Sequence, residues 1–208
     1  MNPYPYLILS LCLLPYPFFL LAAEQPNIIY ILADDMGYGD VAANNPNCKF
    51  PTPFLDRLAE EGMRFSDAHT NSSVCTPTRY GILTGRYSWR THLKGGVLDG
   101  AAGPLIASDR TTVATFLKKQ DYNTACVGKW HLGMSWPTKD GKKPIRSRGD
   151  NIDFTQPIAN GPNDVGFDYY YGISASLNMP PHAYIENRMI DADDLVFAED
   201  SKDIKALG

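Results

Sequence analysis

Acidic side chains gather where an apolar run of this chain ends. The run Asn27–Ala33 is followed directly by Asp34 and Asp35, with Asp40 a little further on. Adjacent carboxylates repel each other unless a cation lies between them, and their hard oxygen atoms suit Ca²⁺ or Mg²⁺ better than zinc. The pair therefore indicates a divalent-cation site, while an Asp-Asp-x-Gly sequence is equally good chemistry for a solvated turn.

A second polar group follows the apolar segment 123–127. Lys129 and His131 are two residues apart, so on extended backbone their side chains would point to the same side. An ammonium group and a titratable imidazole together suit an anionic substrate and proton transfer. Taken alone, the same two residues also fit a surface lysine and a core histidine.

Alternating strand and helix patterns would position these groups. Asn27–Ala33 and 123–127 are short apolar runs typical of buried strands in a parallel sheet. Helices are predicted at three places, namely from Thr52-Pro53 to Gly62, over Thr78–Leu83, and after a cap at Thr111 or Thr112 with Val113, Phe116 and Leu117 facing inward. This order predicts an α/β fold with a mainly parallel central sheet flanked by helices. Ligands of such sheets bind beyond the carboxyl ends of the strands.

Composition narrows the class of protein. The chain has 208 residues, of which 44% are hydrophobic and 20% charged, and this excludes a disordered, collagen-like or coiled-coil protein. The formal net charge is −4, which argues against a nucleic-acid partner because such proteins usually carry a basic surplus.

The N-terminus has the pattern of a targeting segment. Residues 1–23 contain no Lys, Arg, Asp or Glu, and a long apolar stretch ends at Ala22-Ala23. We interpret 1–23 as a signal peptide and 24–208 as the mature chain, which predicts a secreted or periplasmic protein. An uncleaved membrane anchor is the alternative. Four prolines in this stretch argue against a stable membrane span after signal cleavage.

The cysteines left after signal cleavage are odd in number. Cys48, Cys75 and Cys126 remain once Cys12 is removed, which suggests one thiol with its own chemistry. Cys126 lies in an apolar run and is interpreted as a small buried hydrophobe. The sequence does not decide the state of Cys48. Cys75 is distinguished by its neighbours.

The segment Cys75–Arg79, with the sequence Cys-Thr-Pro-Thr-Arg, resembles the signature of the type I sulfatases of the alkaline phosphatase superfamily. Asp34–Asp40 and Gly128–Gly133 are similar to two further motifs of that family. The resemblance also includes Thr52–Ala59 with Gly62–Phe65, Gly166–Asp168 and Gly172–Ser174. These blocks follow the order of the family and span nearly all of the mature chain. The resemblance implies an alkaline phosphatase-like fold.

The resemblance implies that Cys75 is oxidised to formylglycine by a maturation enzyme, for which Pro77 and Arg79 help to define the signal. A hydrated aldehyde offers two hydroxyl groups on one carbon. One would attack sulfur and expel the alcohol, and the other would eject sulfate by re-forming the aldehyde. An ordinary serine would be left as a stable sulfate ester.

The family's metal and charge-stabilising roles carry over to matching positions. Asp34, Asp35 and the modified Cys75 match the ligands of the divalent cation, which is Ca²⁺ in most members, with Mg²⁺ as the alternative. Arg79 matches the residue that holds the hydrated aldehyde. Lys129 matches the residue that binds a sulfate oxygen.

His131 matches the residue that positions the second hydroxyl or takes its proton. Ser176 is a further candidate for contact with the sulfate group. His182 could line the substrate pocket or be a loop histidine.

Members of this family are usually more than twice as long as this chain, and their later half supplies further metal ligands. We therefore expect an N-terminal portion of the catalytic domain, with an incomplete sheet and little activity by itself. The expected reaction is hydrolysis of sulfate esters on a small molecule or glycan. Tyr169–Tyr171 and Tyr184 favour a carbohydrate, since tyrosine rings stack on sugars. A phosphonate or phosphate-ester hydrolase and a non-catalytic binder of sulfated glycans are the alternatives.

Overall fold

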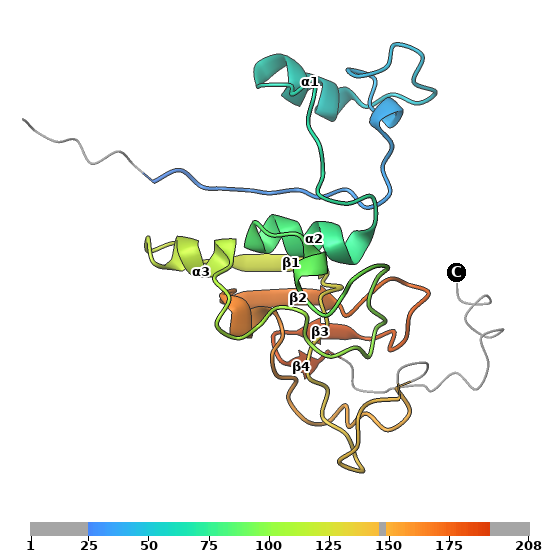
Figure 1. Cartoon of the computed structure of the whole chain (residues 1–208). Coiled ribbons are helices and arrows are strands. Elements are labelled where there is room, and N and C mark those ends of the chain that lie inside the picture. Colours follow the sequence, from blue (N-terminus) through green and yellow to red (C-terminus); the bar gives the residue numbers. More distant parts are fainter. Residues whose placement is uncertain (1–24, 146–148, 192–208) are drawn as a thin grey trace, which may run out of the picture. The chain divides into compact units, whose positions relative to one another are not determined.

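A computed structural model describes residues 25–145 and 149–191 of the chain (Figure 1). The expected signal peptide, residues 1–23, lies outside the described residues. The chain divides into two compact units, Met1–Pro51 and Thr52–Gly208. Among the described residues, no helix combines the length and apolar content needed to cross a membrane.

The first unit contains the short helix η1 (Tyr38–Asp40) in its described part. The carboxylate of Asp40 accepts a hydrogen bond from the Gly37 N–H at 2.9 Å, which closes this turn. The strand predicted over Asn27–Ala33 is wrong for this structure, because the described residues form no strand there and Ile29 and Ile31 are each 84% exposed. Their composition favours extended backbone, but a strand also needs a neighbour with which it exchanges hydrogen bonds.

The α-helices of the second unit follow the predicted positions. They are α1 (Pro53–Glu61), α2 (Cys75–Thr84) and α3 (Val113–Lys118), and the structure adds the short helices η2 (Ser88–Arg90) and η3 (Pro162–Val165). The three predicted α-helices are confirmed. α2 begins earlier than predicted, at Cys75, because Pro77 is tolerated in a first turn, where an N–H group has no intrahelical partner.

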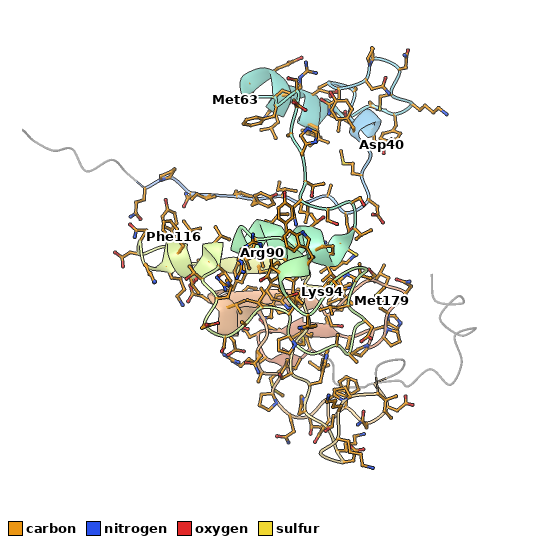
Figure 2. All side chains as sticks on the ribbon, viewed as in Figure 1. Asp40, Met63, Arg90, Lys94, Phe116 and Met179 are labelled. Atoms are coloured by element: carbon orange, nitrogen blue, oxygen red, sulfur yellow. The ribbon has the colours of Figure 1, made fainter. Side chains whose placement is uncertain are left out.

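The cap of α3 sets the orientation of that helix. Thr112 caps it, and the Thr112 hydroxyl donates a hydrogen bond to the Val165 carbonyl at 2.5 Å. The predicted inward face is wrong for Val113 and Phe116, which are 42% and 57% exposed (Phe116 is labelled in Figure 2). Ala114 is the buried residue of the helix. We infer that the bond to Val165 fixes the rotation of this short helix, so that its smallest side chain faces the interior.

The strands form one sheet in the order β1-β2-β3-β4 (Figure 1). They are β1 (Ala125–Lys129), β2 (Tyr169–Ile173), β3 (Tyr184–Glu186) and β4 (Met189–Ile190). β1 and β2 are parallel, while β2–β3 and β3–β4 are antiparallel. The α/β class is confirmed, and the sheet of the described residues is mixed.

β1 begins two residues later than the predicted strand. The Thr124 N–H donates to the Asp168 carboxylate at 2.9 Å and its hydroxyl donates to the Gly166 carbonyl at 2.7 Å, so Thr124 anchors the chain just before β1. The prediction that this strand is buried is wrong for Val127, which is 75% exposed. Within the described part of the chain, β1 pairs along one edge only, with β2.

The core is built on the segment that follows β1. Its apolar residues are buried, namely Trp130, Leu132, Met134 and Trp136, and so are His131 and Gly133 between them. The two parallel strands approach each other closely beside it, since a Cβ atom at Gly172 would lie 1.8 Å from the Gly128 carbonyl oxygen. Only glycine fits there. This packing holds the carboxyl end of β1, where Lys129 and His131 are found.

Candidate active site

Cys75 is the first residue of α2 and is half-buried. The preceding Val74 has extended backbone, with φ −132° and ψ 159°, so the helix starts abruptly at the cysteine. The N–H groups of a first helical turn have no intrahelical partner and carry a partial positive charge. The start of α2 therefore favours negative charge close to Cys75.

Two side chains tie the loop before Cys75 to the first turn of α2. The Asn71 amide donates to the Pro77 carbonyl at 2.7 Å, and the Thr78 hydroxyl donates to the Ser72 carbonyl at 2.8 Å. Pro77 has no N–H group of its own, but its carbonyl accepts this bond from the loop. The position of Cys75 is thus fixed from both sides.

Arg79 joins α2 to the end of β1. One Nη atom of its guanidinium group donates a hydrogen bond to the Lys129 carbonyl, although the two residues are 50 positions apart in the chain. Lys129 is the last residue of β1 and is half-buried. Two of the sequence-predicted site residues therefore meet in the fold, through the Arg79 side chain and the Lys129 backbone.

His131 lies two residues beyond β1 and is 0% exposed. Its ring Nε2 atom is 2.7 Å from the Leu98 carbonyl oxygen, and its backbone N–H donates to the Ser174 carbonyl at 2.9 Å. The extended backbone expected from Lys129 to His131 is wrong, because β1 ends at Lys129 and His131 has a left-handed φ of 56°. Side chains two residues apart point to the same side only on extended backbone, so that expectation does not hold for Lys129 and His131 at this turn.

Cys126, which is half-buried, and the buried Tyr170 are neutral groups close enough to Arg79 for its charge to act on them. Burial raises the pKa of the Cys126 thiol to about 11, against a smaller lowering effect of the Arg79 charge. Burial also raises the pKa of Tyr170, whose hydroxyl donates to the Ile173 carbonyl at 3.0 Å. Both groups stay protonated at neutral pH, so neither supplies a nucleophile or a base.

The expected metal ligands lie in different units of the chain. Asp34 and Asp35 belong to the first unit and are exposed, and Asp35 has a left-handed φ of 60°. Cys75 belongs to the second unit. Among the described residues, no group of three or more His, Cys, Asp or Glu side chains could hold a metal ion. The adjacent carboxylates suit Ca²⁺ chemically, but this cation takes six to eight oxygen atoms, which two carboxylates cannot supply by themselves.

The two weaker candidates lie between β2 and β3. Ser176 is half-buried, and its carbonyl accepts a hydrogen bond from the Met179 N–H at 2.8 Å. His182 is exposed in the loop before β3, in keeping with the loop alternative. No described contact connects either side chain to Cys75, Arg79 or Lys129.

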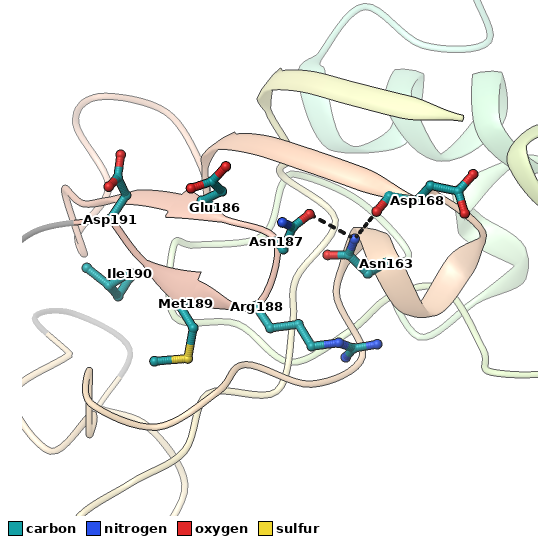
Figure 3. A pocket seen from close by; sticks show the side chains of 8 residues that line it. All are labelled: Asn163, Asp168, Glu186, Asn187, Arg188, Met189, Ile190 and Asp191. Carbon is teal, nitrogen blue, oxygen red and sulfur yellow. Dashed lines mark hydrogen bonds between the residues drawn. The ribbon is translucent and has the colours of Figure 1, made fainter. Parts of the chain in front are cut away.

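A surface cavity of about 480 Å³ lies elsewhere, between η3 and the β3–β4 hairpin (Figure 3). It is lined by Asn163, Asp168 and Glu186–Asp191. Its cation, Arg188, is already held by both carboxylate oxygens of Asp164, at 2.7 and 2.8 Å. The remaining charges in the lining are carboxylates, which would repel a sulfate group, so this cavity is not a sulfate site.

The α/β sheet, with its polar groups beyond the end of β1, defines an alkaline phosphatase-like protein. A family model described as Sulfatase matches residues 26–205, and the chain therefore belongs to the sulfatase family. It is 38% identical over 165 residues to an N-acetylgalactosamine-6-O-sulfatase of Bacteroides thetaiotaomicron, covering 79% of this chain and 30% of that protein. It is 40% identical over 157 residues to arylsulfatase G of Mus musculus, covering 76% and 25%. The chain thus spans less than a third of either relative.

Solved structures give the same family. A Bacteroides thetaiotaomicron structure, described with the metabolism of multiple glycosaminoglycans, matches with a TM-score of 0.71 and 37% identity, over 83% of this chain and 33% of that one. The crystal structure of Ps i-CgsB in complex with k-i-k-neocarrahexaose matches with a TM-score of 0.52 and 29% identity, over 69% and 27%.

Sequence reasoning missed three groups that shape the site. The Asn71 amide donates to the Pro77 carbonyl, and the Thr76 hydroxyl accepts a hydrogen bond from the distant Leu98 N–H. Leu98 contributes only backbone groups, among them the carbonyl oxygen that contacts His131. Thr76 lies inside the recognised motif, which was a signal for it. A backbone carbonyl leaves no trace in side-chain chemistry, so nothing in the sequence pointed to Leu98.

Proposed function

We propose that this chain carries the nucleophile of an enzyme that hydrolyses sulfate esters, with Cys75 converted to formylglycine. Membership of the sulfatase family and relatives named as sulfatases support the reaction class. The observation that carries the proposal is the junction of α2 with β1. There Arg79, four residues after Cys75, binds the carbonyl of Lys129, and His131 follows two residues later.

The groups around the junction suit the charges of this reaction. A hydrated aldehyde at position 75 supplies one hydroxyl to attack sulfur and a second to release sulfate. Arg79 neutralises negative charge beside the nucleophile, and the start of α2 adds its partial positive charge. Lys129 binds a sulfate oxygen and stabilises charge as the S–O bond breaks. His131 takes up the proton that sulfate release requires.

We propose a sulfated carbohydrate as the substrate class. One relative is named for a sulfated N-acetylgalactosamine, and one structural neighbour was solved with a neocarrahexaose. Ser176 and His182 are retained as candidate substrate contacts, because both lie in the segment between β2 and β3 that follows the end of the parallel pair.

Asp34 and Asp35 are proposed to contribute two carboxylates to a Ca²⁺ site, with Mg²⁺ as the alternative, and the modified residue 75 is the proposed third ligand. Both metals prefer such oxygen donors. The test is Asp35→Ala. Its activity should no longer respond to added Ca²⁺, and a variant with normal metal content and normal rate would refute the role.

We propose export to a secreted or periplasmic location and passage through a formylglycine-forming maturation enzyme. The apolar pattern of residues 1–23 supports export, and the Cys-x-Pro-x-Arg pattern at Cys75–Arg79 supports maturation. N-terminal sequencing of the exported protein would test the cleavage after Ala23.

The proposal is tested on protein expressed with its leader in a host that matures sulfatases. Mass spectrometry of the Cys75 peptide should show a loss of about 18 Da, or the hydrate identified by an aldehyde probe. In a full-length version of the enzyme, sulfate release from a sulfated N-acetylgalactosamine oligosaccharide should fall by at least about a thousandfold in Cys75→Ala. Cys48→Ala is the matched control, since Cys48 lies in the other unit, and should keep its rate.

The outcomes separate the alternatives. Release of phosphate in preference to sulfate would favour the phosphate-ester hydrolase. Binding of the sulfated oligosaccharide without turnover, together with an unmodified Cys75 thiol, would favour the non-catalytic binder. Full hydrolysis by Cys75→Ala would refute the assignment of the nucleophile.

A further inference from the structure

A buried hydrogen-bonded path runs from α2 to the imidazole of His131. The Leu98 N–H donates to the Thr76 hydroxyl oxygen at 3.2 Å, and the Leu98 carbonyl oxygen lies 2.7 Å from His131 Nε2. Thr76 and His131 are 0% exposed and Leu98 is 5% exposed. Shielding from water strengthens such bonds and makes the loss of one partner costly.

The contact with Leu98 fixes which ring nitrogen carries hydrogen. A carbonyl oxygen can only accept a hydrogen bond, so His131 Nε2 must be the donor. A neutral imidazole has one N–H group, and its lone pair is then on Nδ1. Nδ1 is therefore the nitrogen of His131 that can take up a proton, after which the ring is an imidazolium with hydrogen on both nitrogens.

The backbone on both sides of this contact is held in place. His131 is fixed by the bond from its N–H to the Ser174 carbonyl at 2.9 Å. Leu98 is held at its N–H by Thr76 and at its carbonyl by His131. Thr76 in turn directly follows Cys75 in the first turn of α2. The residue next to the nucleophile thus fixes the group that orients the imidazole.

We propose that Thr76 is a positioning residue that, through the Leu98 backbone, holds His131 as the Nε2–H tautomer with Nδ1 as the proton-accepting atom. This role rests on the proposed function, in which His131 handles the proton of sulfate release. It differs from a purely structural role because it specifies the protonation site of one ring.

The test compares Thr76→Val, which keeps the shape but loses the oxygen, with Thr76→Ser, which keeps the oxygen. Nitrogen-15 NMR of the histidine-labelled 208-residue chain, with His131→Asn to assign the signal, reports the tautomer at a pH where the ring is neutral. We expect Nε2–H in the unaltered chain and in Thr76→Ser. Thr76→Val should show both tautomers and faster hydrogen exchange of the Leu98 amide.

Thr84→Val is the matched control. It removes a hydroxyl from the other end of α2, where Thr84 donates to the Tyr80 carbonyl at 2.6 Å, and it should leave the His131 tautomer unchanged. An Nδ1–H tautomer in the unaltered chain would overturn the proposal. So would a Thr76→Val protein that is folded by circular dichroism and keeps the Nε2–H form alone.

Activity gives a second readout. In a full-length version of the enzyme and at equal formylglycine content, Thr76→Val should lower kcat by about tenfold with KM unchanged, as expected for the loss of one positioning hydrogen bond. Thr76→Ser should restore kcat. The NMR result does not depend on turnover. If the predicted tautomer is found but the protein has no formylglycine and releases no sulfate, the proposed function alone is refuted. An unchanged kcat in fully matured Thr76→Val would count against the positioning role alone.

Discussion

Asn71 and Gly81 share one small space on the surface of α2. A Cβ atom added at Gly81 would lie 2.3 Å from the side-chain Cγ and Nδ2 atoms of Asn71. Asn71 cannot move away without breaking its 2.7 Å bond to the Pro77 carbonyl, which fixes the loop before Cys75. The same engagement argues against a glycan on Asn71, although Asn71-Ser72-Ser73 has the form of a glycosylation site.

Gly81→Ala should therefore destabilise the protein. Alanine is the better helix former by about 1 kcal/mol, but overpacking costs about 1–3 kcal/mol and here also disturbs the half-buried hydrogen bond from Asn71. We expect a lower midpoint of urea unfolding. Gly95→Ala is the control, because a Cβ atom at Gly95 meets nothing within 4 Å. A Gly81→Ala protein as stable as the Gly95→Ala protein would contradict the close contact.

At the scale of residues, candidate groups could be named from the sequence, but their geometry could not be predicted. Cys75, Arg79, Lys129 and His131 were proposed from residue type and motif, and the structure brings Arg79 to the Lys129 carbonyl. The left-handed turn at His131 could not be predicted, because it depends on the bond to Ser174, far away in the chain.

Asp168 connects three elements at the entrance of the parallel pair. Its carboxylate binds Lys118 at the end of α3 at 2.6 Å. It also accepts hydrogen bonds from Thr124 just before β1, one from the N–H and one from the hydroxyl, whose hydrogen is shared with the Gly166 carbonyl. Asp168 itself directly precedes β2. The hydrogen bond from Lys118, followed by those from Thr124, lowers the pKa of Asp168 from 3.8 to about 2.

This pKa predicts a pH dependence of stability. The folded state holds the carboxylate more strongly than the unfolded state, so Asp168 stabilises the fold above about pH 4, and the contribution disappears as the pH falls toward 2. Asp168→Asn should lower the urea midpoint at pH 7 and reduce the loss of stability between pH 4 and 2. The exposed Asp109, changed to Asn, serves as control. Equal pH profiles for Asp168→Asn and the unaltered protein would exclude this role.

At the scale of elements, local signals located the helices, while burial depended on distant contacts. The Pro53 start and Gly62 end of α1 are local and were predictable. The outward orientation of Val113 and Phe116 follows from the bond between Thr112 and the Val165 carbonyl, which no periodicity of α3 contains.

At the scale of the whole molecule, the α/β class was predictable from the alternation of apolar runs. The mixed sheet was not, because β3 and β4 are three and two residues long and too short to give a pattern. Asn27–Ala33 has the composition of a buried strand, yet it is exposed in the structure. Strand pairing is a non-local property, so composition identified the run but not its environment.

Exposed apolar side chains should make the 208-residue chain associate with itself in solution. Ile29 and Ile31 are each 84% exposed and Val127 is 75% exposed, and apolar surface of this kind promotes association. We expect the isolated chain to bind a hydrophobic dye and, in light scattering, to show a mass above 23.1 kDa that grows with concentration. Ile29→Glu with Ile31→Glu should reduce both signals. The double change of Lys142 and Lys143 to Gln shifts the net charge equally at exposed polar sites and should not. A dye-silent monomer at all concentrations would show that these side chains are covered in solution.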